Sequence, residues 1–232
     1  MILFDGIAFE NIAHVMVEDI RVSPIALNPL ERPRALQFGS EFVRMGGGTR
    51  NVSITFALLE RDMNLRHEHL MNISRWAKTD KEYKIELPTD PNRCLFGVCT
   101  SKPEPSTRQW FESKLRLVFT CISNPFWTSK GEKSVACGTQ FMALGDAPPL
   151  MRIERTLSGA ASNQSYSNSK ETMTFSTIPA GNMVIDLNRQ TAKVGNTDIM
   201  QYYQPSGSFL IPRIGVQTIT GTGTVKYKER WE

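Results

Sequence analysis

The sequence predicts a mainly β protein with one substantial helix, in which an α+β domain is followed by a β-sandwich. Three observations lead to this fold class. Apolar and polar residues alternate over residues 115–121, the period of a strand with one buried face. Residues 63–78 carry apolar side chains at three- and four-residue spacings, as a helix that packs on one side does. After residue 128 short alternating segments are separated by turn residues and no helical period appears, which is typical of a sandwich.

The two predicted domains meet at the segment Cys121–Trp127. This segment ends the strand of residues 115–121 with a proline and two large aromatic residues, and the chain after it is more polar and richer in glycine. Proline interrupts the backbone hydrogen bonds of a sheet, so a strand should stop here. We therefore expect an N-terminal domain over residues 1–128 and a C-terminal domain over residues 129–232.

The N-terminal domain should begin with two strands, over Met1–Phe9 and Val15–Val22. Asp5-Gly6 has the composition of a hairpin turn. The three prolines of Pro24–Pro33 then argue against regular structure for about a dozen residues.

The clearest predicted hairpin lies between Phe38 and Phe56. It consists of a strand over Gln37–Met45, a turn at Gly46–Gly48 and a second strand in which every other residue from Val52 to Leu58 is apolar. Consecutive glycines supply the positive φ angles that a tight turn needs.

A helix over Met63–Lys78 should follow, with Asp62 as its N-cap. Strands are expected at Tyr83–Leu87 and Leu95–Cys99 because their apolar residues alternate. The helix residues expected to face a sheet are Leu65, His69, Ile73, Trp76 and Ala77.

The C-terminal domain should contain short strands joined by turns at Asn188-Arg189 and Gly195-Asn196. Ser158–Lys170 is rich in Ser, Asn and Ala and has little to bury, so it should be a loop or a hairpin tip. The expected strands lie within Gly131–Gly138 and at Leu150–Thr156, Met183–Leu187, Ala192–Val194, Phe209–Ile211 and Thr224–Tyr227.

Composition and charge exclude several classes of protein. Among the 232 residues 40% are hydrophobic and 22% charged, as in a folded globular protein. The net charge of +4 is spread along the chain, whereas a sequence-independent nucleic-acid binder concentrates Lys and Arg on one element. No segment has the apolar length of a membrane span, so no membrane insertion is expected, and the opening Met1–Asp5 lacks the basic start of a signal peptide, which predicts synthesis in a cytoplasm. The four cysteines form no Cys-x-x-Cys pair and are expected to be buried thiols.

Motifs for chemistry fail on spacing. A zinc-protease helix places its histidines four residues apart, but His67 and His69 are two apart. Gly46–Thr49 is not followed by the Gly-Lys-Ser/Thr of a phosphate-binding loop, and strands are expected on both sides of it. No Gly-x-Ser-x-Gly motif is present. The sequence therefore nominates no catalytic, cofactor-binding or metal-binding residues, and we expect a protein that is not an enzyme.

Nine short segments, taken in order, carry a family resemblance over nearly the whole chain. They are Phe4–Ile7, Val17–Pro24, Arg50–Phe56, Ser74–Lys78, Phe119–Trp127, Ile185–Leu187, Val194–Asn196, Gly215–Gln217 and Val225–Trp231. Each segment alone is only a strand or helix pattern with a turn. In this order they resemble the distal tail proteins (Dit) of phages with long non-contractile tails, a siphovirus tail component family.

The resemblance implies a specific architecture and role. The N-terminal domain would be a belt domain, similar to a tail-tube layer, that assembles into a homo-hexameric ring, and the C-terminal domain a galectin-like or jelly-roll β-sandwich outside the ring. In related proteins the last strand can return to the belt domain, so residues 225–231 could belong to either domain.

The implied partners are the tail tube protein, the tail hub or tail-associated protein and a receptor-binding protein, in a baseplate or tail tip that serves host adhesion. DNA would only pass through the central channel. The implied location is the distal end of the virion tail, after synthesis in the host cytoplasm.

The predicted hairpin between Phe38 and Phe56 is our candidate for ring assembly. A long alternating hairpin without proline leaves sheet edges that a monomer would not pair, and ring closure removes such edges. The residues nominated for this interface are Phe42, Arg44, Gly46, Gly48 and Arg50.

Two other functions are weighed against this one. The C-terminal domain could be a carbohydrate-binding module that stacks host-surface glycans on aromatic residues, but packing within the domain is the favoured interpretation of those residues. An enzyme acting on cell-wall polymers would need a pair of carboxylates in a cleft, which the sequence does not reveal. The aromatic residues in question are Tyr166, Tyr202, Tyr203 and Phe209.

Overall fold

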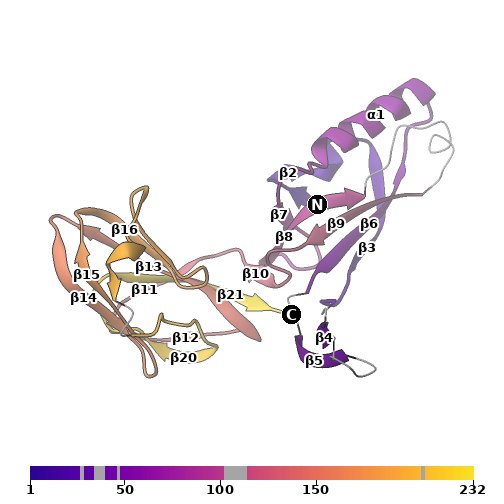
Figure 1. Cartoon of the computed structure of the whole chain (residues 1–232). Helices are drawn as coiled ribbons and strands as arrows, with labels where there is room; N and C mark the ends of the chain where they lie inside the picture. The colour runs from indigo at the N-terminus through magenta and orange to yellow at the C-terminus, as the bar shows by residue number, and fades with distance from the viewer. Residues whose placement is uncertain (27–28, 34–39, 46–47, 102–113, 205–206) are drawn as a thin grey trace. The chain divides into compact units, whose positions relative to one another are not determined.

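Figure 1 shows the computed structural model of the chain, which describes residues 1–26, 29–33, 40–45, 48–101, 114–204 and 207–232. The chain divides into an N-terminal unit of residues 1–127 with Glu232 and a C-terminal unit of residues 128–231. Strands dominate both units, and the one α-helix of the described residues lies in the first. The predicted fold class, mainly β with one helix, is confirmed.

The N-terminal unit is built from nine strands, a short 3-10 helix (η1) and the α-helix. Their bounds are β1 Leu3–Phe4, β2 Ile7–Ala8, η1 Phe9–Asn11, β3 Val15–Val22, β4 Pro29–Pro33, β5 Ser40–Met45, β6 Arg50–Leu58, α1 Met63–Trp76, β7 Tyr83–Glu86, β8 Arg93–Ser101 and β9 Leu115–Cys121. β10, Trp127–Ser129, lies at the boundary between the two units.

Seven of these strands pair antiparallel in the order β2–β1–β7–β8–β9–β6–β3. β8 connects two parts of this path, because Leu95–Gly97 pair with β7 while Val98–Ser101 pair with β9. The strand at the centre of the second part is β6, which pairs with β3 on one side and with β9 on the other.

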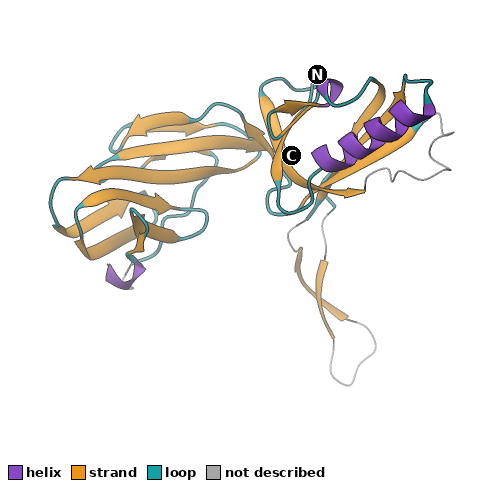
Figure 2. Ribbon diagram, turned by 90° about the horizontal axis from the view of Figure 1, so that it is seen from above, coloured by secondary structure: helices purple, strands orange, loops and turns teal. Residues whose placement is uncertain are grey.

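The helix α1 begins as the sequence predicts and lies along the sheet, as Figure 2 shows. The Asp62 carboxylate accepts hydrogen bonds from the backbone N–H groups of Asn64 and Leu65, at 2.8 and 3.4 Å. The helix ends at Trp76, two residues earlier than predicted. Leu65, which was expected to face the sheet, is 44% exposed, and Leu70 is buried instead. No helix in the described part of the chain is long and apolar enough to cross a membrane.

Aromatic side chains form the centre of the core under α1. Trp76 stacks on Phe9 at a centroid distance of 5.0 Å, and Phe4 packs edge-on against Trp76 at 5.4 Å. The indole N–H of Trp76 also donates to the carbonyl of Ile7 at 3.3 Å. The helix is therefore tied to the first hairpin both by ring packing and by a hydrogen bond.

The first hairpin confirms the predicted turn at Asp5-Gly6, but this turn lies inside the segment that was predicted as a single strand. Phe4 pairs with Ile7, and both turn residues have positive φ, 53° and 76°, as a two-residue hairpin loop of this kind requires. The turn joins β1 to β2 within residues 1–9, so the segment is two short strands instead of one.

The predicted hairpin between Phe38 and Phe56 is wrong. β5 pairs with β4, and β6 pairs with β3 and β9. The expectation that the prolines prevent regular structure is also wrong, because β4 runs from Pro29 to Pro33. The two prolines are the first and last residues of a strand in a two-stranded sheet, where a missing N–H costs little.

The C-terminal unit contains eleven further strands and a second 3-10 helix (η2). Their bounds are β11 Lys133–Ala136, β12 Gln140–Ala143, β13 Ala147–Leu157, β14 Ala161–Ser167, β15 Thr172–Ile178, β16 Gly181–Asp186, β17 Thr191–Val194, β18 Thr197–Asp198, η2 Met200–Tyr202, β19 Tyr203–Gln204, β20 Gly215–Thr218 and β21 Thr224–Trp231.

These strands form two layers around one core, visible in Figure 2. One layer has the order β18–β17–β16–β13–β21–β11. The other consists of β12–β20 and β14–β15–β19, which the Ser167–Thr220 bridge connects. The last strand, β21, pairs with β13 and β11 within this unit. The turns at Asn188-Arg189 and Gly195-Asn196 are where the sequence predicts them, between β16 and β17 and between β17 and β18.

Two expectations for this unit are wrong. Ser158–Lys170, expected as a loop, contains β14, which pairs with β15 over its length. Only one side chain of β14 is buried, so its sequence does not alternate between apolar and polar residues. Backbone hydrogen bonds to β15 hold this strand in the sheet instead. Phe209–Ile211, expected as a strand, has no regular structure, although Leu210 is fully buried.

The tyrosines proposed as a glycan platform serve packing instead. Tyr166, in β14, is 1% exposed, and its hydroxyl donates to the carbonyl of Thr222 at 3.1 Å. Tyr203 lies between Phe175 and Phe209, at centroid distances of 5.9 and 5.8 Å. Tyr166 is therefore not available to stack against a sugar.

A buried ion pair connects two loops of the C-terminal unit. The Arg213 guanidinium donates through both terminal nitrogens to the Glu171 carboxylate, which is 9% exposed. Asn168 Nδ2 donates to the same carboxylate at 2.7 Å. The pKa of Glu171 falls to about 2, first because of Arg213 and then because of Asn168.

Asp62→Ala should destabilise α1 by about 1 kcal/mol, because two backbone N–H groups lose their acceptor. Native-state hydrogen exchange of the peptide that covers residues 63–76 should then be about fivefold faster. Glu68→Ala, at an exposed position inside the same helix, is the matched control and should leave exchange unchanged. Equal exchange in the two variants would contradict the capping role.

Glu171→Gln should destabilise the C-terminal unit at neutral pH and lose this effect in acid. A carboxyl whose pKa is lower in the folded state stabilises the fold above its ordinary pKa of 4.5, and this stabilisation disappears as the pH falls towards about 2. Calorimetric melting temperatures of both proteins, measured across this range, should converge at the acid end. A difference that stays constant with pH would refute the assignment; Glu68→Gln, an exposed carboxyl in the other unit, is the control.

Candidate assembly surfaces

The first candidate surface is an arm that continues the β3–β6 pair. Beyond Val22 the ladder goes on through a hydrogen bond from Ser23 N to Asn51 O at 2.8 Å, and then through two between Ala26 and Thr49 at 2.8 and 3.2 Å. β4 and β5, which follow β3 and precede β6 in the chain, also pair antiparallel with each other. We call β4–β5 the arm; Figure 2 shows it extending from the N-terminal unit.

Gly48 lies where the arm joins the sheet, and its role differs from the one expected. It was predicted to supply a positive φ, but its φ lies outside that region. Instead there is no room for a side chain, because a Cβ would lie 2.6 Å from the carbonyl oxygen of Ala26 and 2.5 Å from Ile25 Cγ2. A glycine is therefore required for the two strands to approach each other at this point.

Arg50 belongs to the interior of the N-terminal unit. It is the first residue of β6, is 4% exposed and pairs with Cys121 of β9. Burial, followed by the charge of Glu82, raises the pKa of the Cys121 thiol to about 12, and the nearby Arg50 charge opposes this rise. The Arg50 side chain consequently offers little surface to a second copy of the chain.

The other nominated residues belong to the arm or to its connection. Phe42 and Arg44 are part of β5. Gly46 lies outside the described residues. Two of the five nominated residues thus belong to a hairpin, but its second strand is β4 and not β6.

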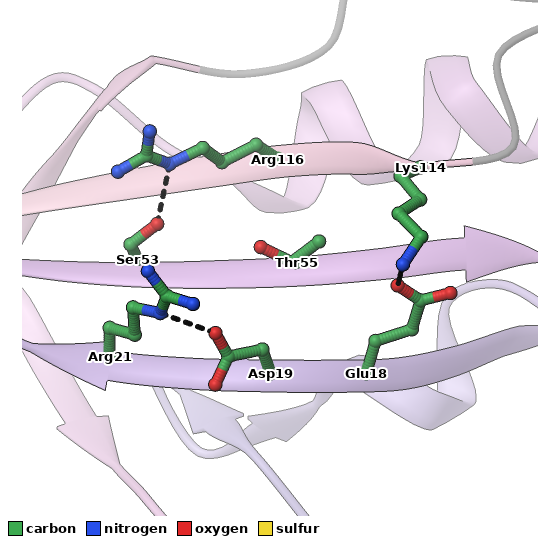
Figure 3. A pocket seen from close by; sticks show the side chains of 7 residues that line it. All are labelled: Glu18, Asp19, Arg21, Ser53, Thr55, Lys114 and Arg116. Carbon is green, nitrogen blue, oxygen red and sulfur yellow. Dashed lines mark hydrogen bonds and ion pairs between the residues drawn. The ribbon is translucent and has the colours of Figure 1, made fainter.

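The second candidate surface is the polar face of β3, β6 and β9, opposite the core (Figure 3). Along β6 the apolar residues Val52, Ile54 and Phe56 are fully buried, and Ser53 and Thr55 therefore point to the other face. A hollow of about 390 Å³ lies on this face. It is lined by Glu18, Asp19, Arg21, Ser53, Thr55, Lys114 and Arg116.

A β-bulge increases the charge on this face. The register between β3 and β6 shifts between Val17 and Asp19, so Glu18 is an extra residue. A bulge redirects side chains, and here both Glu18 and Asp19 line the hollow. Sequence alternation alone would assign one of these two neighbours to the core.

Four of the five charged side chains on the polar face form ion pairs, and the fifth, Arg116, donates to a hydroxyl (Figure 3). Lys114 pairs with Glu18 at 2.9 Å and Arg21 with Asp19 at 2.5 Å, while Arg116 Nε donates to Ser53 Oγ at 2.6 Å. Such exposed pairs add little stability, because water screens them. Among the described residues no group of His, Cys, Asp and Glu has the geometry of a metal site. The arrangement is suited to a hydrated surface with both signs of charge.

Comparison with solved structures identifies a similar protein over the whole chain. The crystal structure of the Dit protein (gp19.1) of phage SPP1 matches with a TM-score of 0.73 and 14% sequence identity, over 100% of this chain and 98% of that chain. That protein is described as a paradigm of the hub adsorption apparatus in phages that infect Gram-positive bacteria. No family model and no curated protein matches the chain.

Two structures of the phage p2 baseplate in its activated conformation, one with Sr and one with Ca, match more weakly. Their TM-scores are 0.44 and 0.43 at 9% and 8% identity, over 94% of this chain and 91% of those chains. These two matches are too weak to establish a fold, whereas the SPP1 match does so. From its first strand to its last, this chain has the fold of a phage distal tail protein, as the sequence resemblance predicts.

Proposed function

We propose that this protein is a structural component of a phage tail and performs no catalysis. In this proposal six copies form a ring at the distal end of the tail, between the tail tube and the hub with its host-adhesion proteins. The observation that carries the proposal is the likeness to the SPP1 Dit protein over the full length of both chains. A fold shared end to end, including both units, favours a shared architectural role over the chance similarity of one domain.

The arm is the part of the chain that we assign to ring contacts. β4 and β5 form a sheet of two strands, and within the described residues neither pairs with another strand. An isolated two-stranded sheet is marginally stable in water, and its outer edges carry unpaired backbone groups. A neighbouring copy that covers the arm removes both problems. Repeated around an axis, this head-to-tail contact closes into a ring.

The residues that the sequence nominates for the ring interface do not all have the same role in this proposal. Phe42 and Arg44 belong to the covered arm, and Gly46 lies outside the described residues. Gly48 allows the arm to leave the sheet, because it permits the close approach to Ala26. Arg50 acts within its own subunit, since it is buried there.

The polar face of β3, β6 and β9 should stay in contact with water in the ring. Burial of its ion pairs in a permanent interface would cost desolvation energy, and such interfaces are relatively apolar. Its charges are of both signs and four of the five are in ion pairs, which weakens the attraction to phosphate. A face of this kind is compatible with DNA that passes through a channel without being bound.

Replacing residues 27–48 with Asn-Gly should produce a monomer. A two-residue turn preserves the pairing of Ala26 with Thr49 and of β3 with β6, so the N-terminal unit keeps its sheet and loses only the arm. Negative-stain microscopy of the full chain should reveal six-fold rings with a central hole, and light scattering should give six times its mass of 26.2 kDa.

Hydrogen exchange over residues 63–76 is the control that the shortened protein is folded. Rings formed by a folded protein without the arm would refute the assignment of the contact. A full chain that remains a single subunit at high concentration, and is missing from tail ends of intact particles, would refute the proposed function itself.

A further inference from the structure

Exposed apolar side chains gather on one part of the C-terminal unit, the ribbon of paired strands β12 and β20 and the residues next to them. Figure 1 labels these two strands. Single exposed apolar residues are normal on protein surfaces, but a contiguous group indicates an interaction site. We call this group the apolar face. It consists of Met142 (56% exposed), Leu144 (48%), Ile214 (46%) and Val216 (61%).

The register of the ribbon makes this surface continuous. Met142 of β12 lies directly opposite Val216 of β20, and the next pair is Ala143 with Gly215. The ladder ends at this pair, and Leu144 and Ile214 are the residues next to it on the two chain segments. The cross-strand pair of Met142 and Val216 is therefore the centre of the apolar face, with Leu144 and Ile214 beside it.

The ribbon is firmly supported from below. Phe141 and Ala143, which alternate with the exposed residues, are buried, and the Phe141 ring packs on Tyr227 at 4.9 Å. The apolar face is therefore the outer side of a folded layer, and its exposure is not the result of a loose segment.

The outer edge of β12 is closed by side chains. The Tyr227 hydroxyl donates to the carbonyl of Met142 at 3.4 Å, and Leu144 N donates to Glu229 Oε1 at 3.0 Å. Glu229 is held in turn by Lys133 at 2.7 Å. A partner strand cannot use these backbone groups without displacing both side chains. Contact should therefore be made by side chains across the face, not by strand addition.

A hollow of about 320 Å³ adjoins the same face, and Ile214 and Val216 are among the residues that line it. Gln140 and Thr218, which pair two residues before Met142 and Val216, also line it, together with Lys170 and Arg213. Arg213 is held by the buried Glu171, so the unneutralised charge at the hollow is the exposed Lys170. A ligand that complements this hollow therefore carries a carboxylate next to apolar groups.

We propose that the apolar face and the hollow together receive a segment of another protein, with aliphatic side chains on the face and an acidic side chain at Lys170. The inference deepens the proposed function, since it rests on this protein being an adaptor and identifies where its next partner docks. A glycan is disfavoured because no aromatic ring lines the hollow. A second copy is disfavoured because the face exposes on the order of 400 Å², about half of what one side of a stable interface buries.

The experiment selects binders from a displayed library of random peptides on the full chain. Selected peptides should be enriched in Leu, Ile or Val with a neighbouring Asp or Glu. Fluorescence anisotropy of a selected peptide should give at least about tenfold weaker binding to Met142→Glu and to Val216→Glu. Lys170→Glu should also weaken binding, and a peptide with its acid changed to Lys should bind this variant better than the original.

Met16→Glu is the matched control, because Met16 is exposed to a similar extent, 49%, on the other unit. It should bind the peptide as the unchanged chain does. Failure to select peptides, or binding that all four variants share, would overturn the inference, as would glycan-array binding or a change of oligomeric state that Met142→Glu abolishes. Rings seen by microscopy of Met142→Glu would show that such a failure concerns this inference and not the proposed function.

Discussion

The pairing of β6 on both sides is the constraint on which the N-terminal unit depends. Its buried residues Val52, Ile54 and Phe56 form the floor of the core under α1, while Ser53 and Thr55 place polar groups on the opposite face. Its first residue, Arg50, is held inside the unit, and Gly48 just before it brings the chain against Ala26. Core, polar face and arm thus share one strand. A one-residue slip of β6 would exchange the two faces and disrupt all three together.

The two units treat their sheet edges in opposite ways. In the C-terminal unit, side chains of β21 occupy the backbone groups at the edge of β12, as Tyr227 and Glu229 demonstrate. In the N-terminal unit, β4 and β5 have only each other within the described residues. An edge closed by side chains prevents pairing with a strand of another chain. The edges of an open two-stranded arm are available for such pairing. This contrast supports assembly through the arm and side-chain docking through the apolar face.

Sequence patterns predicted correctly those elements that depend only on residues close together in the chain. The cap of α1 at Asp62, the turn at Asp5-Gly6 and the alternation of β6 were all readable from neighbouring residues. Pairing partners were not, because β5 is adjacent to β6 in sequence but bonds to β4. The polar face and the apolar face were missed for the same reason: each unites strands far apart in the chain, and the bulge at Glu18 is invisible to a strict period of two.

Surface chemistry distinguishes what each exposed face can do. The polar face carries two ion pairs and the Arg116 guanidinium, so covering it would exchange good hydration for poor burial. The apolar face has the opposite balance, because covering Met142 and Val216 releases water from apolar surface, while Tyr227 and Glu229 already bond to two backbone groups at the edge of β12. A partner therefore gains most by docking on β12–β20 and least by docking on β3–β6–β9. An adaptor that must hold one partner while it leaves a passage open needs both kinds of surface.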